Sequence, residues 1–401
     1  LKRGELDLGM ATIAALLNAR HVPSAQGKWR AMASGVSTMS RTAITRSLPS
    51  RTPTRSSDEM LRRIYRIVAS YLSTPRPIEA FEFLARLMAS TDPENDPRTH
   101  SLAKAMWAGY LAAGSIGMMG GRAIREAVTL ADACDDPYAK MVAASAEGIL
   151  LVCQGRWDDM RNSFARGEAV YQQLGLHFSW EASFVRTYWS LGETLAGEPL
   201  RAIALLDGLE DRTDNLVARS MARTFRARAM VAANQIDQAE ALATSMRREQ
   251  QGAIGVASIY QEAFFAELAI ANGRYDDALQ RGDIFTAKAK RLGVWMLPAL
   301  RALCETFQAE AFLAKAETAT GLAKYRYATQ CIQHAGVLFA LGPRSCYGPT
   351  ALRLIAAAEF TAGRRRRAAL TLRWAAAAAA KRGSVLERAR ITALHQATVR
   401  E

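Results

Sequence analysis

The chain has 401 residues, of which half are apolar and 22% are charged. So apolar a composition can bury a core, which excludes a wholly disordered chain. Its 12 prolines and 27 glycines are dispersed, which excludes a collagen-like or low-complexity chain. Abundant Ala, Leu, Arg and Glu, without long β-branched runs, favour helices.

The net charge of +14 is concentrated at the two ends of the chain. Residues 1–57 carry +7 and residues 363–401 carry +8, whereas residues 58–362 carry −1. Basic ends on a neutral body attract phosphates or an acidic partner through fields that salt weakens. The arginine enrichment of a GC-rich genome explains the same pattern without any partner, and both explanations stay open.

The first 43 residues are predicted to form a small basic helical unit. Residues 44–57 are rich in Ser, Thr, Pro and Arg, which predicts a flexible linker. Because this linker has little apolar surface, we expect residues 1–57 to move independently of the rest. From residue 58 to residue 401, the periodicity of apolar residues predicts one helical domain.

A short turn recurs between neighbouring helices of this domain. It starts with Gly or Asn, which adopts the left-handed conformation that ends a helix. In four copies a small residue lies where the helices must approach closely: Ala202, Ala239, Ala278 and Ala368. The first residues of the turns, spaced 37 to 50 apart, are Gly155, Gly197, Asn234, Gly273, Ala323 and Gly363.

This recurrence resembles tetratricopeptide-type repeats, with a longer and less regular period than the usual ~34 residues. It predicts an all-α fold, a tetratricopeptide-like stack of antiparallel helix pairs, or α-solenoid. One helix pair cannot bury both of its apolar faces, so successive pairs must stack in order. An irregular helical bundle is the alternative.

A more specific resemblance lies in the segment WEASFVRTYWSLG at residues 180–192. It is similar to a segment in the helical C-terminal half of large bacterial regulators, in which a Ser/Thr kinase and an ATPase module precede the helical repeats. Residues from about 98 to 395 follow that general plan. The resemblance implies a sensor or scaffold region, with the kinase and ATPase modules upstream of this chain.

The N-terminal unit has a different resemblance. Residues 13–29, IAALLNARHVPSAQGKW, resemble the short DNA-binding segment of bacterial serine recombinases, although His21 departs from the usual Gly. No domain with a serine nucleophile precedes it here, so the resemblance does not imply recombination by this chain. A gene-fusion remnant is the alternative.

Motifs for catalysis are missing from the sequence. It contains no P-loop, kinase signature, H-E-x-x-H or G-x-S-x-G motif, and its five histidines are far apart. The five cysteines form no C-x-x-C pair, and their odd number argues against a disulfide framework. We therefore expect no enzyme, no catalytic residue, no cofactor and no metal, with the cysteines in the core of a cytoplasmic protein. No apolar run reaches the ~18 residues of a membrane span.

Two sets of side chains are candidate contact residues. Core packing is the default role of the aromatic side chains at 180 and 189, and lining a groove for a peptide or small effector is the alternative. The basic candidates for binding nucleic acid or an acidic partner are Lys28, Arg30, Arg41, Arg364, Arg365, Arg366 and Arg367, and the aromatic candidates are Trp180 and Trp189. A solvated surface is the alternative for the four consecutive arginines, which open a helix where the dipole disfavours cations.

Together these patterns predict a non-catalytic scaffold of a bacterial regulatory protein, which binds a protein partner or senses an effector. The alternative is a DNA-binding regulator, or a recombinase-derived fragment, that uses the basic N-terminal unit.

Overall fold

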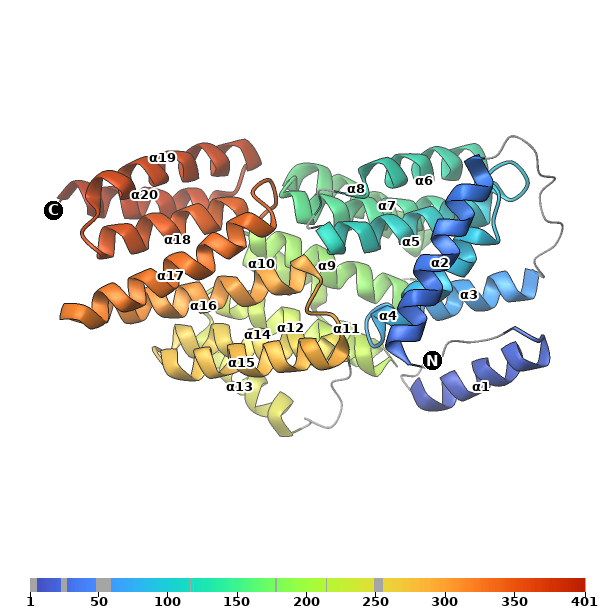
Figure 1. Cartoon of the computed structure of the whole chain (residues 1–401), viewed down its shortest axis with the longest axis horizontal. Helices are drawn as coiled ribbons and strands as arrows, with labels where there is room; N and C mark the ends of the chain where they lie inside the picture. Colours follow the sequence, from blue (N-terminus) through green and yellow to red (C-terminus); the bar gives the residue numbers. More distant parts are fainter. Residues whose placement is uncertain are drawn as a thin grey trace.

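The computed structural model describes residues 6–22, 27–47, 59–115, 117, 119–176, 179–213, 215–248 and 255–400. Within these ranges every regular element is an α-helix, as Figure 1 shows. The predicted all-α class is therefore confirmed. None of the described helices is long and apolar enough to cross a membrane.

The helices follow one another with few residues between them. In chain order they are α1 (Leu6–Ala19), α2 (Lys28–Ser47), α3 (Glu59–Leu72), α4 (Pro77–Ala89), α5 (Pro97–Ser115), α6 (Gly121–Ala133), α7 (Pro137–Gln154), α8 (Trp157–Gln173), α9 (Trp180–Ala196), α10 (Pro199–Leu206), α11 (Leu209–Arg212), α12 (Leu216–Ala232), α13 (Ile236–Arg248), α14 (Val256–Ala271), α15 (Tyr275–Leu292), α16 (Pro298–Thr318), α17 (Gly321–Leu341), α18 (Gly348–Thr361), α19 (Arg365–Arg382) and α20 (Val385–Arg400).

Helices that are neighbours in the chain pack as pairs, such as α5 with α6, α7 with α8, α14 with α15 and α16 with α17. The first helices of successive pairs also touch, in the order α5, α7, α9, α12, α14, α16 and α18. In addition, α16 returns to contact α5, and α20 contacts α9. These returning contacts bring helices that are far apart in the sequence around a common interior.

Most of the predicted turns have the expected backbone. Gly155, Gly197, Gly273 and Gly363 all have positive φ angles, between 68° and 100°, and Asn234 has a φ of 60°. The turn predicted at Ala323 is wrong, because Ala323 lies inside α17. The chain breaks a few residues earlier, where Gly321 opens that helix with a φ of 59°. The boundary between α16 and α17 therefore lies at a glycine with a positive φ, and not at the alanine that the sequence pattern indicated.

Close approach of the paired helices depends on small residues. Ala202, Ala239 and Ala278 are fully buried, as predicted from their place in the turns. Gly148 of α7 lies so close to Phe164 of α8 that an added Cβ would be 2.5 Å from its ring. A larger side chain at such a position would push the two helices apart.

The N-terminal helices are packed against the body, contrary to the expected independent movement of residues 1–57. Ile13 and Leu17 of α1 share a buried core with side chains of α3 and α4. On α2, the Ser34 hydroxyl donates a hydrogen bond of 3.1 Å to the buried Glu82 carboxylate of α4. The side chains of α1 and α2 themselves make the contacts with the body. Docking therefore does not depend on the apolar surface of the predicted linker.

The predicted linker is also wrong at its start. Helix α2 continues to Ser47, so residues 44–47 are helical and the basic unit extends beyond residue 43. The remainder of the predicted linker, residues 48–57, lies outside the described residues.

The docking of α1 can be tested at a single side chain. We expect Leu17→Ala to lower the free energy of unfolding by about 2 kcal/mol, because Leu17 is fully buried and its loss leaves a cavity. The adjacent Leu16, which is 44% exposed, provides the control variant Leu16→Ala. Urea denaturation measures both variants, and equal small effects would show that α1 is not docked in solution.

Candidate ligand-binding cavity

A cavity with a volume of about 1280 Å³ lies in the interior that the returning contacts close. Its lining comes mainly from α3, α4, α5, α7, α9, α12, α14 and α16. From α5 onward, these are the first helices of the pairs. Four of the second helices, α6, α10, α13 and α15, contribute no side chain to the lining. Since typical small-molecule sites occupy roughly 300–1000 Å³, the space is large enough for a sizeable ligand.

The sequence of the first helices explains why they can line this cavity. On α14, the side chains of Phe264 and Leu268 are buried in the outer core, while Val256 and Tyr260 line the cavity. A helix with apolar residues all round must be covered on every side. The second helices, such as α15 with Asp276 and Asp277 in its first turn, keep one polar face for solvent.

A continuous row of aromatic rings forms one wall. Four rings that line the cavity are in contact one after another. Their centroids are 5.8 Å apart for Tyr71 and Trp180, 5.6 Å for Trp180 and Phe184, and 4.7 Å for Phe184 and Tyr188. Trp180, Phe184 and Tyr188 are spaced four residues apart and therefore project from the same face of α9. The wall is thus apolar, and its rings meet at interplanar angles of 29°, 38° and 54°, so they offer both faces and edges.

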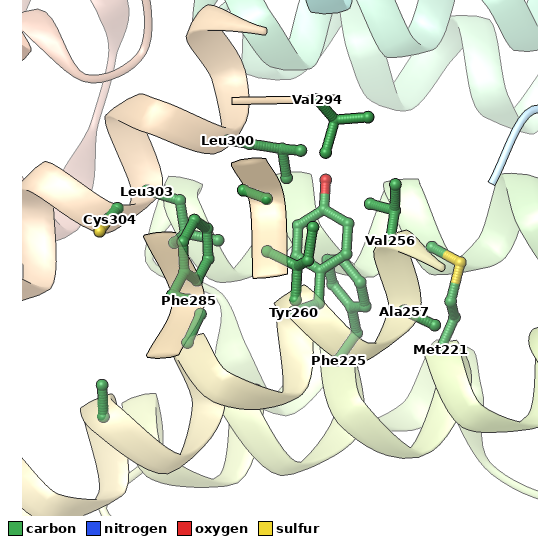
Figure 2. Close-up of a cluster of buried hydrophobic side chains, with 14 of the residues drawn as sticks. Met221, Phe225, Val256, Ala257, Tyr260, Phe285, Val294, Leu300, Leu303 and Cys304 are labelled. Carbon is green, nitrogen blue, oxygen red and sulfur yellow. The ribbon is translucent and has the colours of Figure 1, made fainter. Parts of the chain in front are cut away.

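Tyrosine hydroxyls provide polar groups in this apolar wall. Tyr260 packs against Phe225 with ring centroids 4.9 Å apart, and Figure 2 shows its hydroxyl directed past Val256 toward Val294. Tyr188 lies near Tyr260, and burial raises the pKa of both. Burial also raises the pKa of Tyr347 on the same lining. All three remain protonated, and hence remain hydrogen-bond donors, at any physiological pH.

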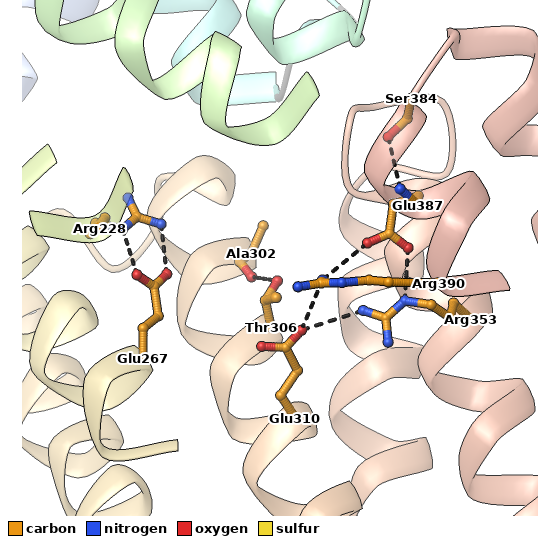
Figure 3. Close-up of polar contacts among 9 residues, drawn as sticks. All are labelled: Arg228, Glu267, Ala302, Thr306, Glu310, Arg353, Ser384, Glu387 and Arg390. Carbon is orange, nitrogen blue, oxygen red and sulfur yellow. Dashed lines mark hydrogen bonds and ion pairs between the residues drawn. The ribbon is translucent and has the colours of Figure 1, made fainter. Parts of the chain in front are cut away.

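Arg228 of α12 is a buried cation in the cavity lining. Its Nε and Nη2 groups donate hydrogen bonds of 2.8 and 2.7 Å to the Glu267 carboxylate of α14, as Figure 3 shows. Its Nη1 group is buried without a partner. Within the described residues, Arg228 is the one cavity-lining residue with such an unpartnered buried polar atom. An unsatisfied donor of this kind costs free energy until an acceptor reaches it.

A second polar region lies around Tyr138 of α7. The Arg66 guanidinium donates a hydrogen bond of 3.1 Å to the Tyr138 hydroxyl and lies over its ring, 5.4 Å from the centroid. Glu181 of α9 also lines the cavity, and both charges act on Tyr71 and Tyr138. Arg98 also lines the cavity and acts on Tyr138, but it is paired with Asp136 at 2.7 Å, so positive and negative charges both surround Tyr138.

The structure separates the two tryptophans that were candidates for lining a groove. Trp180 lines the cavity and stacks on Tyr71. Trp189 lies elsewhere: it stacks on Phe164, with centroids 5.7 Å apart, and donates a hydrogen bond to the buried Glu193. Nine residues after Trp180, the side chain at 189 has rotated by about 180° around the helix, which packs it, partly buried, against the core that α8 and α9 share.

The basic candidates of the N-terminal unit do not form one cluster with a common role. The Lys28 ammonium donates a hydrogen bond of 2.6 Å to the Arg291 carbonyl at the end of α15. Trp29, next to Lys28, is 67% exposed and contributes to the cavity lining together with Met32. Arg30 and Arg41 are exposed on α2. Lys28 therefore holds the start of α2 against the body.

The four consecutive arginines lie at the start of α19. Arg364 is its N-cap, and Arg365, Arg366 and Arg367 occupy its first turn, all exposed to solvent. They lie far from α2 in the chain and at the opposite end of the long axis (Figure 1). The structure thus does not bring the two basic ends together.

The cavity residues that sequence analysis missed carry a recognisable signal. Arg228 follows Phe225 by three residues and Met221 by seven, so a charge occupies the buried face of an otherwise apolar pattern. Such a residue is expected to have a buried partner. Which acid pairs with it, Glu267 here, depends on the packing of α12 against α14.

Neither a metal cluster nor a reactive thiol is found in this region. Among the described residues, no three His, Cys, Asp or Glu side chains are placed to hold a metal ion. All five cysteines are free, and burial raises the pKa of Cys153, which lines the cavity, to about 12. The chain matches no protein-family model and no curated protein.

Proposed function

We propose that the chain is a non-catalytic effector-sensing scaffold of a bacterial regulatory protein, and that its effector is a small molecule bound in the interior cavity. The observation that carries the proposal is the aromatic-lined space of about 1280 Å³ inside the row of first helices. A large apolar pocket with few converging polar groups is the usual form of a small-molecule site.

The proposal treats the helix pairs as a tetratricopeptide-like stack. Ordered contacts between successive pairs support this view, as do the left-handed Gly or Asn residues between them. In such a stack each pair contacts mainly its neighbours, so small rotations between pairs add up along the chain. A ligand that contacts α3, α9, α14 and α16 together would favour one set of these rotations. Its binding would thereby change the shape of the outer surface that a partner contacts.

The cavity can be blocked without disturbing its walls. Gly109 of α5 lines the cavity, and a Cβ placed there meets no atom within 4 Å. We expect Gly109→Trp to fold normally and to weaken saturable binding of Prodan, a neutral naphthalene dye whose emission shifts to the blue when it leaves water. The expected loss of affinity is at least about tenfold, because the indole occupies the volume that the dye needs.

Gly336 of α17 provides the matched control. A Cβ there also meets no atom within 4 Å, but the residue does not line the cavity. Gly336→Trp should leave Prodan binding unchanged. If Gly109→Trp bound the dye as well as the unchanged protein does, or if the unchanged protein did not bind it, the proposed effector site would be rejected.

The second candidate function, nucleic-acid binding, is favoured by the exposed arginines at the start of α19. Four adjacent cations at a helix N-terminus are locally unfavourable, and phosphates would relieve this repulsion. A DNA shift assay at about 50 and 200 mM salt should then show affinity that Arg365→Ala with Arg366→Ala reduces. Binding that is absent at the lower salt concentration would exclude this function.

A further inference from the structure

We propose, on the basis of the cavity function above, that the ligand is a neutral, planar and largely apolar molecule with a hydrogen-bond acceptor at one end, and that this acceptor pairs with the Nη1 group of Arg228. Three features of the cavity specify these properties separately.

The planar and apolar character follows from the aromatic wall. Tyr71, Trp180, Phe184 and Tyr188 are in contact in series, and Leu191 and Leu195 continue the same face of α9 along the cavity. A rigid ring system can meet these tilted rings by its face or by its edge, and it loses little conformational freedom on binding. A flexible, strongly hydrated molecule would leave water between itself and these rings.

The acceptor follows from the unpartnered donor. Two groups of the Arg228 guanidinium are held by Glu267, so its orientation is fixed before any ligand binds. The remaining Nη1 lies on the side away from Glu267 in Figure 3 and has no partner among the described residues. Tyr260 and Tyr347, which also line the cavity, lie near the same guanidinium. A ligand oxygen at this point would satisfy the donor.

Neutrality follows from the local charges. Glu267 already neutralises Arg228 through two hydrogen bonds, so a ligand carboxylate would add an uncompensated negative charge to a buried region. A carbonyl or hydroxyl oxygen accepts from Nη1 without this penalty.

The test compares three dyes that share one ring system. Prodan carries a ketone, a second naphthalene lacks that ketone, and a third carries a carboxylate in its place; all three retain the dimethylamino group. We expect Prodan to bind at least about tenfold more tightly than either of the others, which corresponds to one hydrogen bond to a charged donor. Fluorescence titration of the full chain measures all three affinities.

The decisive variant is Arg228→Lys, which keeps the positive charge beside Glu267 but removes the fixed Nη1 group. It should lower Prodan affinity about tenfold and leave the ketone-free dye unaffected. Arg353→Lys is the matched control, because Arg353 is a buried, paired arginine that does not line the cavity. Should Arg228→Lys fail to fold, the double variant Arg228→Met with Glu267→Met removes the same donor without leaving a buried charge.

The outcomes distinguish the two proposals. Equal binding of all three dyes, blocked by Gly109→Trp and insensitive to Arg228→Lys, would retain the cavity function but overturn the assignment of the ligand class. Tighter binding of the carboxylate dye would also overturn it. Binding of none of the dyes would reject the cavity function itself.

Discussion

Arg353→Met is expected to lower the free energy of unfolding by about 3 kcal/mol. Arg353 of α18 is buried, and its Nε donates a hydrogen bond of 2.8 Å to the Glu387 carboxylate of α20. Its Nη2 donates a longer one of 3.3 Å to Glu310 of α16, so this side chain joins three helices, as Figure 3 shows. Methionine retains most of the packing but leaves the buried Glu387 with the partly exposed Arg390 as its remaining ion-pair partner. Urea denaturation followed by circular dichroism measures the change.

The control for this prediction is a double variant. Arg353→Met with Glu387→Met removes both charges and should recover most of the lost stability, since an apolar pair fills the space without an unpaired ion. The ion pair of Arg63 and Glu59 is exposed and serves as a second control. Arg63→Met should change the free energy of unfolding by less than about 1 kcal/mol. A large loss in the double variant would show that packing, rather than charge pairing, dominates here.

The same carboxylate makes stability dependent on pH. Burial raises the pKa of Glu387, but the charge and hydrogen bond of Arg353 outweigh burial, so the net pKa lies below its usual value. Because the folded pKa is lowered, this contribution is fully present above the unfolded value of about 4.3 and is lost as the pH falls through the folded pKa. Glu387→Gln should therefore flatten the acid side of the stability profile, which thermal unfolding at several pH values would show.

Gly255→Ala is expected to destabilise the chain by about 3 kcal/mol and to weaken Prodan binding. Gly255, just before α14, has a φ of 64°, and a Cβ there would lie 2.3 Å from the Pro75 carbonyl oxygen in the turn between α3 and α4. The adjacent Val256 amide donates a hydrogen bond of 3.1 Å to the Thr74 carbonyl. The added methyl group combines backbone strain with a clash against backbone, and it forces apart two walls of the cavity.

Gly273→Ala separates strain from clash. Gly273 has a similar φ of 72°, but a Cβ there meets no atom within 4 Å. Its variant should lose only about 1 kcal/mol, the cost of a left-handed alanine, and should bind Prodan normally. Thermal unfolding and dye titration measure both variants. If the two glycines behaved alike, the contact between Gly255 and Pro75 would not contribute to closing the cavity.

Much of the helical structure follows from local chemistry and was predictable. Gly155, Gly197 and Asn234 end helices because their backbone adopts positive φ angles cheaply, whatever surrounds them. Ala323 misled the prediction because alanine carries no such backbone preference, and the actual break relies on Gly321 two residues earlier. The linker prediction erred for a related reason: Ser and Thr disfavour helix only weakly, so α2 continues to Ser47.

The cavity was less predictable because its lining combines side chains from distant parts of the chain. The four-residue spacing of Trp180, Phe184 and Tyr188 indicates one aromatic face of a helix, but not whether that face meets a core or a space. Trp189 shows the ambiguity: it is equally aromatic, but it is packed against a core, stacked on Phe164. Only the packing of α7, α8 and α9 decides between the two environments.

By itself, the sequence determined the helical class, most of the turns and the small residues on which the helix pairs close, because these depend on backbone preferences and on spacing within about ten residues. Tertiary structure alone decided that α16 returns to α5, that α14 meets the turn at Pro75, and that α1 and α2 are packed against α3 and α4. It also decided that Arg228 pairs with Glu267 and keeps one donor unpartnered in the cavity lining. Such contacts depend on the summed rotations between successive helix pairs, and no local pattern of residues encodes that sum.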